Sequence, residues 1–401
     1  MDIKSVAVVG GGTMGAGIIQ TLSSFEFPVA FKDINEDLIK KCLDQVSRIY
    51  ISALKKGKIT EAKMKDCISL IQGGTDYNGF EKADLVIEAV PEDLEVKKKV
   101  FIELDRVCKP EAIFASNTSA LSITQLASFI KKRETRVIGM HWFNPAHIMK
   151  LIEIIPSLTT SEDIVVYLTK FCVGLGKVPI RVKECAGFLV NRLLGIYSNE
   201  ALFMVEEGKK PADIDQAALS LGMPIGPLSL VDMVGWDVVY QANWTLYEEY
   251  GARFALPSLM AQIVEEGRLG VKTGKGIYMY EIPSDSPPQK IESVASSMTE
   301  SMLKEISGRL LQVWINEGIR CLDEGIVEAK DIDYALQIGT GVPKGPLSWA
   351  DDLGLDVILN GLKQQRDRFG ERFWPSPLLK RKVYAGHLGK KVGKGFFDYK
   401  S

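Results

Sequence analysis

The sequence predicts an α/β protein in which a domain built on a parallel sheet is followed by two related all-α domains. In the first part of the chain, short β-branched apolar runs alternate with segments whose apolar residues recur at helical spacing. This alternation is typical of βαβ units. From about Gly187 the pattern changes to long helical segments separated by glycine and proline turns, and this second part contains an internal repeat.

Length and composition exclude several classes of protein. The chain has 401 residues, 46% hydrophobic and 25% charged, which argues against disordered, collagen-like and coiled-coil proteins. The net charge of −2 gives no overall attraction to nucleic-acid phosphates. No run reaches the roughly 18 apolar residues that a membrane span needs, and no secretion signal is indicated. We expect a cytoplasmic protein without nucleic-acid or membrane partners.

The cysteines support the same compartment. They are scattered, with no Cys-x-x-Cys pair and no histidine cluster beside them, so a disulfide framework or a zinc site is not expected. We therefore expect no metal and a reducing environment. The six residues are Cys42, Cys67, Cys108, Cys172, Cys185 and Cys321.

Five strands are expected in the first domain, with helices between them. Leu38–Leu54 and Val96–Cys108 have apolar residues at helical spacing and are predicted to be two of these helices. Parallel strands joined in this way form one sheet, and ligands bind at its carboxyl edge. The expected strands are Val6–Gly10, Val29–Asp33, Leu85–Val90, Ile113–Ser116 and Val137–His141.

The second part of the chain repeats itself with an offset that drifts only from 117 to 119 residues. Two copies are too few for a solenoid, so we expect two domains that bury an apolar face against each other, as a two-fold dimer does between chains. The proline-containing segment Ile282–Lys290 is predicted to be the linker. The matching segments are Arg192–Leu194 and Arg309–Leu311, Asn199-Glu200 and Asn316-Glu317, Asp213–Asp215 and Asp331–Asp333, Gly226–Ser229 and Gly345–Ser348, and Gly274–Gly276 and Gly393–Gly395.

The first expected strand runs directly into a Gly-x-Gly-x-x-Gly motif formed by Gly10, Gly12 and Gly15. Gly10 permits the tight turn, Gly12 lets the backbone approach a pyrophosphate, and Gly15 permits close packing of helix on strand. Because the motif lies at the first strand-to-helix junction, a dinucleotide site is favoured over a flexible glycine turn. The contacts are expected from these glycines and from Thr13 and Met14 between them.

An acidic residue indicates which dinucleotide is bound. Asp33 ends the second strand, 23 residues after Gly10, where a carboxylate accepts hydrogen bonds from the ribose hydroxyls and repels a 2′-phosphate. NAD is therefore predicted, while the adjacent Lys32 keeps NADP open. The expected domains are a Rossmann-type dinucleotide-binding domain at residues 1–184 and two related all-α domains at residues 185–282 and 291–401.

Residues at the end of the strand Leu85–Val90 are further candidates for cofactor binding. Ala89 and Glu92 lie at the expected carboxyl edge of the sheet, and Lys97 follows in the next helix. The alternative is an acidic first turn of a solvated helix with Lys97 exposed, and the spacing alone does not separate the two.

A histidine is the expected acid–base group. The chain has three histidines, and His141 lies at the end of a strand, where its imidazole can exchange a proton with a bound substrate. The other two, His147 and His387, lie in loop-like stretches and are expected at the surface. The partner of His141 should be a carboxylate. Glu153 leads, because it lies in the further expected strand Leu151–Ile155, whose apolar residues should bury it, and Glu88 competes by the same argument.

Polar residues at two further places complete the expected site. Asn117 and Ser119 follow the strand Ile113–Ser116, where Ser119 can donate to a substrate oxygen and Asn117 to nicotinamide or ribose. Taken alone, this stretch is better explained as a turn and helix cap. Asn191 opens the first helical domain, and the aligned residue of the second copy is Gly308. This difference suggests one active site per chain.

These motifs together resemble the L-3-hydroxyacyl-CoA dehydrogenase family, with motifs in the family's order over nearly the whole chain. The resemblance implies helical domains like the C-terminal domain of 6-phosphogluconate dehydrogenase, with the second copy like the duplicated domain of the family's multifunctional members. Trp142 is a mild variation at a position where phenylalanine is also common. The motifs are Gly10–Gly17, Glu88–Glu92, Ser116–Ser119, His141–Pro145 and Gly187–Arg192.

The resemblance implies reversible, NAD-dependent oxidation of an (S)-3-hydroxyacyl-CoA, of short chain such as 3-hydroxybutyryl-CoA, to the 3-ketoacyl-CoA. It implies that His141 is the general base, that Glu153 is its partner, and that Ser119 and Asn191 hold the substrate. It also implies contacts with NAD from Asp33, Glu92, Lys97 and Asn117.

Three questions stay open at this point. Lys55 and Lys56 are candidate contacts for the phosphates of CoA, although a lysine run is more often a solvated helical face. The alternatives to the acyl-CoA reaction are a dehydrogenase of a free hydroxy or sugar acid and a non-catalytic NAD-binding protein. We expect a monomer or a homodimer, because the duplication can satisfy the interface of the helical domains within one chain.

Overall fold

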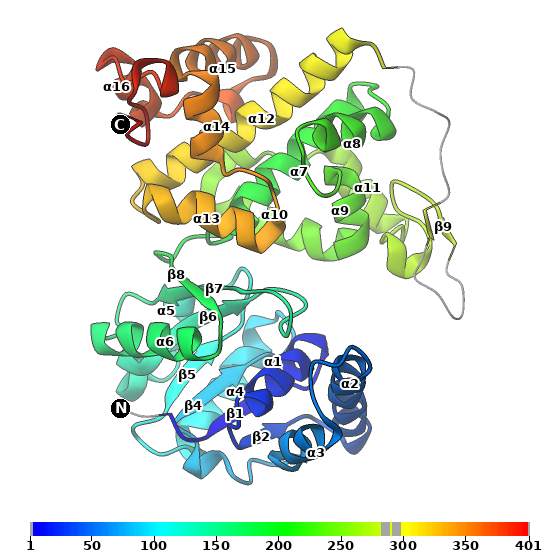
Figure 1. The fold of residues 1–401 in the computed structure, drawn as a ribbon, viewed down its shortest axis with the longest axis vertical. Coiled ribbons are helices and arrows are strands. Elements are labelled where there is room, and N and C mark those ends of the chain that lie inside the picture. Colours follow the sequence, from blue (N-terminus) through cyan, green and yellow to red (C-terminus); the bar gives the residue numbers. More distant parts are fainter. Residues whose placement is uncertain (1–2, 282–288, 291–297, 400–401) are drawn as a thin grey trace. The chain divides into compact units, whose positions relative to one another are not determined.

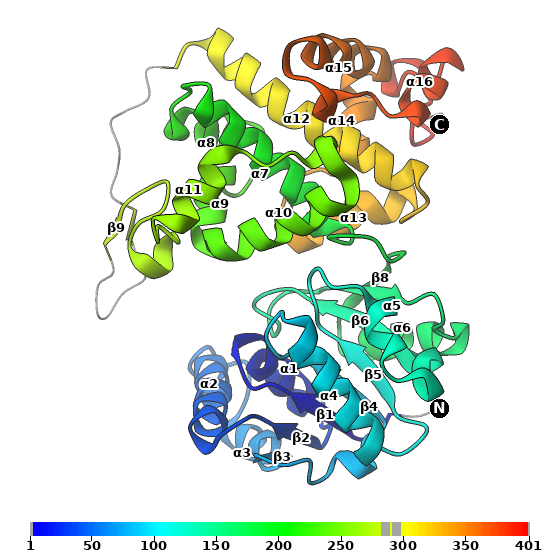
Figure 2. The same ribbon diagram turned by 180° about the vertical axis from the view of Figure 1, so that it is seen from behind.

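The computed structural model describes residues 3–281, 289–290 and 298–399 (Figures 1 and 2). The chain divides into two compact units, Met1–Phe188 and Leu189–Ser401. Residues 282–288 of the expected linker Ile282–Lys290 lie outside the described residues. Each unit is described separately below.

The first unit is built on one eight-stranded sheet with the strand order β3-β2-β1-β4-β5-β6-β7-β8. Neighbouring strands are parallel except for β6 and β7, which are antiparallel. All five of these expected strands are confirmed, and so is the strand expected at Leu151–Ile155. The strands are β1 (Val6–Val9), β2 (Val29–Lys32), β3 (Ile71–Gly74), β4 (Leu85–Glu88), β5 (Ile113–Ser116), β6 (Val137–Trp142), β7 (Leu151–Pro156) and β8 (Val178–Arg181).

Helices connect the strands, and their first residues are set by capping side chains. Asn35, Asp93 and Ser122 each accept a hydrogen bond from the backbone amide three residues on, which satisfies an amide that the helix itself leaves open. Every helix among the described residues is too short or too polar to cross a bilayer. The helices of this unit are α1 (Thr13–Ser24), α2 (Glu36–Lys55), α3 (Glu61–Ser69), α4 (Leu94–Val107), α5 (Ile123–Ser128) and α6 (Glu162–Gly174).

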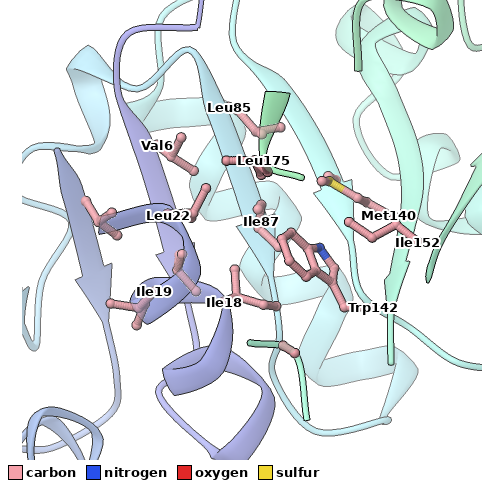
Figure 3. Packing of buried hydrophobic residues seen from close by; sticks show 14 of the residues in the cluster. Val6, Ile18, Ile19, Leu22, Leu85, Ile87, Met140, Trp142, Ile152 and Leu175 are labelled. Carbon is pink, nitrogen blue, oxygen red and sulfur yellow. The ribbon is translucent and has the colours of Figure 1, made fainter. Parts of the chain in front are cut away.

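The core of the first unit lies between the sheet and the helices on its two faces. On one face, Ile18 and Leu22 of α1 and Leu175 after α6 pack against side chains such as Ile87 and Met140 of the central strands (Figure 3). On the other face, α4 is held by edge-to-face contact between Phe101 and Phe114 of β5. Burial of both faces explains why these strands are continuous apolar runs. Because β1, β4, β5 and β6 pair in parallel, their carboxyl ends lie next to each other.

The second unit contains the two copies of the repeat, and corresponding helices follow in the same order (Figure 1). The long helices α7 and α12 pack against each other. The first copy consists of α7 (Val190–Glu206), α8 (Pro211–Ser220), α9 (Pro227–Val234), α10 (Trp236–Tyr250) and α11 (Ser258–Glu265). The second consists of α12 (Glu300–Asp323), α13 (Ala329–Thr340), α14 (Pro346–Leu353), α15 (Leu355–Phe369) and α16 (Pro377–Tyr384).

Buried arginines join the two copies reciprocally. Arg192 of the first copy donates to Glu317 of the second at 2.7 Å, while Arg309 of the second forms an ion pair with Glu200 of the first. All four side chains are at most 2% exposed. Removing one partner of such a pair leaves an uncompensated buried charge, so each copy depends on the other for its electrostatic balance.

A buried aspartate in each copy explains why the Gly-Lys-Gly segment is repeated. The carboxylate of Asp232 accepts hydrogen bonds from the amides of Ile277 and Tyr278 at 2.9 Å, directly after the first such segment. Asp351 accepts the equivalent bonds from Phe396 and Phe397. The repeated glycines therefore allow a loop to pack closely on a buried carboxylate.

Candidate active site

The glycine-rich turn between β1 and α1 has the geometry that a dinucleotide needs. A Cβ on Gly10, whose φ is +97°, would lie 2.5 Å from the carbonyl oxygen of Ala89, and one on Gly15 would lie 1.9 Å from that of Gly10. A Cβ on Gly12, by contrast, would meet no atom within 4 Å. Two glycines therefore allow the turn itself, and the third leaves open space at the N-terminus of α1, where a pyrophosphate can approach.

Asp33 lies beside this turn. Its carboxylate accepts hydrogen bonds from the amide of Gly11 at 2.8 Å and from the amide of Ile34 at 2.7 Å. The ammonium group of Lys32 lies 4.9 Å from the ring centroid of Tyr77, so this cation has an aromatic partner within the protein. The arrangement places a negative charge where an adenosine ribose is expected, which fits NAD better than NADP.

Glu88 at the end of β4 belongs to a buried network rather than to His141. Its carboxylate accepts hydrogen bonds from Lys97 at 2.6 Å, from Ser116 of β5 at 2.6 Å and from the amide of Val90 at 2.8 Å. Glu88 and Lys97 are each 1% exposed. The alternative interpretation, in which Lys97 is exposed to solvent, is therefore wrong. Glu88 joins the carboxyl ends of β4 and β5, and Lys97 is bound to it.

Glu92 connects this network with the loop that carries Ser119. It accepts hydrogen bonds from the amides of Ser119 and Ala120 at 2.8 and 2.9 Å and from the hydroxyl of Thr118. Burial raises the pKa of Glu92, but the Lys97 ammonium 3.4 Å away and these hydrogen bonds outweigh it and hold the pKa below its ordinary value. Glu92 is therefore ionised at neutral pH and fixes the shape of the Ser119 loop.

His141 and Glu153 form a buried pair. They lie directly opposite each other on the antiparallel strands β6 and β7, and Nδ1 of His141 is 2.7 Å from a carboxylate oxygen of Glu153. His141 is 5% exposed and Glu153 is fully buried. A carboxylate on Nδ1 keeps the proton there, stabilises the imidazolium and leaves Nε2 as the nitrogen that can serve a substrate.

Asn117 links the neighbouring strand ends. Its side-chain oxygen accepts a hydrogen bond from the amide of Trp142 at 2.9 Å, one residue after His141. The amide of Asn117 itself donates to the carbonyl oxygen of Glu88. The loops after β4, β5 and β6 are thus joined by hydrogen bonds at one edge of the sheet, which brings Ser119, His141 and the glycine-rich turn to the same edge.

The loop between β6 and β7 is held by a buried lysine. Lys177 donates to the carbonyl oxygens of Ala146 and Met149 at 2.6 and 2.8 Å, and burial lowers its pKa to about 8. Burial, together with the charges of Lys177 and Lys56, lowers the pKa of His147 below its ordinary value. His147 is therefore neutral at physiological pH and half-buried rather than a plain surface residue.

The remaining candidates lie at the end of α2 or in the second unit. Lys55 is the last residue of α2 and Lys56 caps it. Asn191 lies in the first turn of α7, in the second unit. Within the described residues, no group of three or more His, Cys, Asp and Glu side chains could hold a metal ion.

Several residues shape the site through contacts that were not predicted, although Ser116, Thr118 and Phe188 lie within the motifs named above. Ser116 and Thr118 are buried in the Glu88 and Glu92 hydrogen-bond networks, Lys177 is far from His141 in the sequence, and Phe188 packs on the imidazole. The spacing of Ser116 and Thr118 from the glutamates gave no signal. A lysine within an apolar stretch was the only hint at Lys177.

The chain matches the models of two domains named for 3-hydroxyacyl-CoA dehydrogenase. The NAD-binding domain matches residues 5–185, and the C-terminal domain matches twice, at residues 187–280 and 306–399. The double match agrees with the internal repeat.

The chain is also similar to curated proteins and solved structures with related names. The fatty acid oxidation complex subunit alpha of Vibrio cholerae is 37% identical over 381 residues, which cover 93% of this chain and 54% of that protein. The chain thus spans about half the length of the curated relatives it matches. A 3-hydroxybutyryl-CoA dehydrogenase structure from Escherichia coli is 29% identical, covers 96% of this chain and 99% of that chain, and superposes with a TM-score of 0.86.

A shorter relative covers less of this chain. The structure of (S)-3-hydroxybutyryl-CoA dehydrogenase from Ralstonia eutropha is 38% identical and covers 70% of this chain and all of that chain, with a TM-score of 0.68. Since the two domain models together match most of the sequence, in the order in which the structure arranges the two units, this chain belongs to the 3-hydroxyacyl-CoA dehydrogenase family.

Proposed function

We propose that this chain is an NAD-dependent dehydrogenase that reversibly oxidises (S)-3-hydroxyacyl-CoA to 3-ketoacyl-CoA. The observation that carries the proposal is the buried pair of His141 and Glu153, 2.7 Å apart, at the sheet edge that also bears the glycine-rich turn. A histidine with a carboxylate on Nδ1 is suited to take a proton from a hydroxyl group. Membership of the family supports the same reaction.

In the oxidative direction, Nε2 of His141 accepts the proton of the substrate 3-hydroxyl while the hydrogen on C3 leaves as hydride. Glu153 stabilises the imidazolium that forms and keeps the ring in one orientation. Bound NAD supplies the hydride acceptor. Ser119 and Asn191 hold the substrate through its oxygen atoms, and the Ser119 loop is kept in shape by Glu92.

The residues of the glycine-rich turn and Asp33 would hold NAD. The open space at Gly12 admits the pyrophosphate, and the Asp33 carboxylate receives the ribose hydroxyls. The cofactor-binding part of the proposed site also includes Glu92, Lys97 and Asn117. Since the structure pairs Lys97 with Glu88, we assign to Lys97 the positioning of the strand ends rather than a charge contact with phosphate.

The phosphates of CoA need cationic groups. Lys55 and Lys56 at the end of α2 are the proposed contacts. The charge of Lys56 contributes to lowering the pKa of His147 in the β6–β7 loop, which supports a position for Lys56 near that loop. A short acyl chain such as 3-hydroxybutyryl is proposed because the chain is similar over nearly its full length to a structure named 3-hydroxybutyryl-CoA dehydrogenase.

The test is NADH formation, followed by absorbance, from (S)-3-hydroxybutyryl-CoA with NAD or NADP. Wild type, His141→Gln and the matched control His147→Gln are compared. We expect activity with NAD, a loss of about 10²-fold or more in kcat for His141→Gln, and little change for His147→Gln. A series of (S)-3-hydroxyhexanoyl-CoA, (S)-3-hydroxyoctanoyl-CoA and (S)-3-hydroxydecanoyl-CoA then gives the chain-length preference.

Two results would contradict the proposal. Equal activity in wild type and His141→Gln would remove the assigned base. A folded wild-type protein that binds NAD but turns over no acyl-CoA of any length would favour a dehydrogenase of free hydroxy or sugar acids, and inactivity on those acids too would favour a non-catalytic NAD-binding protein.

We also propose that the chain acts as a monomer or a homodimer in the cytoplasm. The reciprocal arginine–glutamate pairs satisfy the interface between the helical copies within one chain. The scattered spacing of the six cysteines, none of them in a Cys-x-x-Cys pair, supports a reducing compartment. Light scattering tests the first expectation, and a tetramer or larger assembly would refute it.

A further inference from the structure

Phe188, the residue that closes the first unit, has an unusual backbone conformation. Its φ is +49°, in the left-handed region that L-residues with large side chains rarely adopt, and it follows Gly187 with a φ of +69°. The side chain is nevertheless only 1% exposed. A strained backbone of this kind persists only where the surrounding structure holds it in place.

Three contacts fix the segment that carries this ring. The amide of Val182 donates to Ile154 of β7, and the carboxylate of Glu184 accepts hydrogen bonds from the amide and hydroxyl of Thr124 at the start of α5. At Cys185, the carbonyl oxygen accepts a hydrogen bond from the amide of Phe188, and the thiol donates to the carbonyl oxygen of Phe188. The position of the Phe188 ring is therefore set by the sheet and by α5.

The ring lies against His141. Its centroid is 5.8 Å from that of the imidazole at an interplanar angle of 55°, while Phe143 lies 4.6 Å away at 53°. Glu153 holds one edge of the imidazole by the hydrogen bond to Nδ1. Two aromatic rings and one carboxylate thus restrict the rotation and tilt of the imidazole.

We propose that Phe188 is a positioning residue for His141, with its ring fixing the direction in which Nε2 points. The proposal rests on the proposed function, because it assumes that His141 carries the proton. A single hydrogen bond at Nδ1 leaves the imidazole free to tilt about that bond, and contact with the rings removes this freedom. Misplacement of a reacting group by a small distance costs rate even when the substrate still binds.

The test compares two variants. Phe188→Leu keeps an apolar side chain that is unbranched at Cβ but removes the ring, whereas Phe188→Tyr keeps the ring. Phe101→Leu is the matched control, because Phe101 is a fully buried ring of the same unit that packs on Phe114 under α4. Circular dichroism and thermal melting establish that each variant is folded. Steady-state kinetics with (S)-3-hydroxybutyryl-CoA and NAD give kcat and both KM values.

Proton NMR reports on how the Phe188 ring lies against the His141 imidazole, and it does so without an assay of activity. The chain has only three histidines, so the imidazole C–H signals can be assigned with His147→Gln and His387→Gln. Phe188→Leu should shift the His141 signals through loss of the ring current and leave those of His147 and His387 in place. Phe188→Tyr should keep the wild-type positions, and Phe101→Leu should not move them.

For kinetics we expect kcat of Phe188→Leu to fall about tenfold with both KM values nearly unchanged, and Phe188→Tyr to retain most of kcat. Unmoved His141 signals in Phe188→Leu, or a kcat loss equal to that of Phe101→Leu, would overturn the proposal. If wild type turns over no acyl-CoA, the proposed function fails, whereas a signal shift confined to Phe188→Leu would still establish the ring contact.

Discussion

Replacing Lys177 by methionine should change how the stability of the first unit depends on pH. The Lys177 side chain donates to the carbonyl oxygens of Ala146 and Met149, and its ammonium lies 5.3 Å from the centroid of the Trp142 ring. Burial lowers its pKa from 10.5 to about 8. The neighbouring Cys172 remains a thiol at alkaline pH, because burial raises its pKa.

The sign and size follow from the two pKa values. Between about pH 8 and 10.5 the folded protein has released the Lys177 proton while the unfolded chain still binds it, so stability rises with pH across this window. The full shift corresponds to about 3 kcal/mol. Because solvent still reaches part of the side chain, we expect about 2 kcal/mol. Wild type should gain this free energy of unfolding relative to Lys177→Met as the pH rises.

The measurement is urea unfolding at several pH values from about pH 7 to about pH 10, spanning most of that window. Hydrogen-exchange labelling and mass spectrometry of peptides from Val137–Pro156 report on the first unit separately. Lys65→Met is the control, because Lys65 is 70% exposed in its ion pair with Glu61. A stability difference between wild type and Lys177→Met that does not change with pH, or that falls as pH rises, would refute the reasoning.

Three further predictions concern the site. Glu153→Gln keeps a hydrogen-bonding group at Nδ1 of His141 but replaces the carboxyl group by an amide. With His141 as the proposed base, kcat should fall by about 10²-fold with KM little changed in steady-state assays, and an unchanged kcat would contradict the proposal. Asp33→Ser removes the carboxylate that repels a 2′-phosphate, so the ratio of kcat/KM for NAD over NADP should fall about tenfold, and a constant ratio would place the selectivity elsewhere. Lys97→Met removes the ion-pair partner of the buried Glu88 carboxyl group, so urea unfolding should show a loss of about 3–5 kcal/mol, most of which the double variant with Glu88→Gln recovers. Equal losses in both variants would count against the pair.

Much of the sheet could be predicted because its central strands are buried on both faces and therefore consist of continuous β-branched runs. The two strands that were not predicted, β3 and β8, contain Gly73 and Gly74 or Pro179, residues that weaken a strand pattern and are tolerated at the edges where these strands lie. The helical repeat was visible because its packing residues recur at nearly constant spacing. Edge position is a property of the whole sheet, which local sequence does not report.

The candidate site shows the same division. Scarcity of histidine and burial of Glu153 indicated the pair before the structure placed the two residues opposite each other on β6 and β7. The uses of Glu92 and Phe188 could not be foreseen, because one depends on a loop folding back over a carboxylate and the other on a left-handed backbone angle. Both features arise from contacts between distant segments, and no local pattern encodes them.

The reciprocal arginine–glutamate pairs between the helical copies also bear on how such a chain can evolve. In a homodimer every substitution appears twice, once on each side of the two-fold axis, so a change at one interface position is imposed on both. In this chain Arg192 with Glu317 and Arg309 with Glu200 are encoded separately. One pair can therefore be replaced by an apolar pair while the other is kept, and each copy is free to acquire or lose surface chemistry without altering its twin.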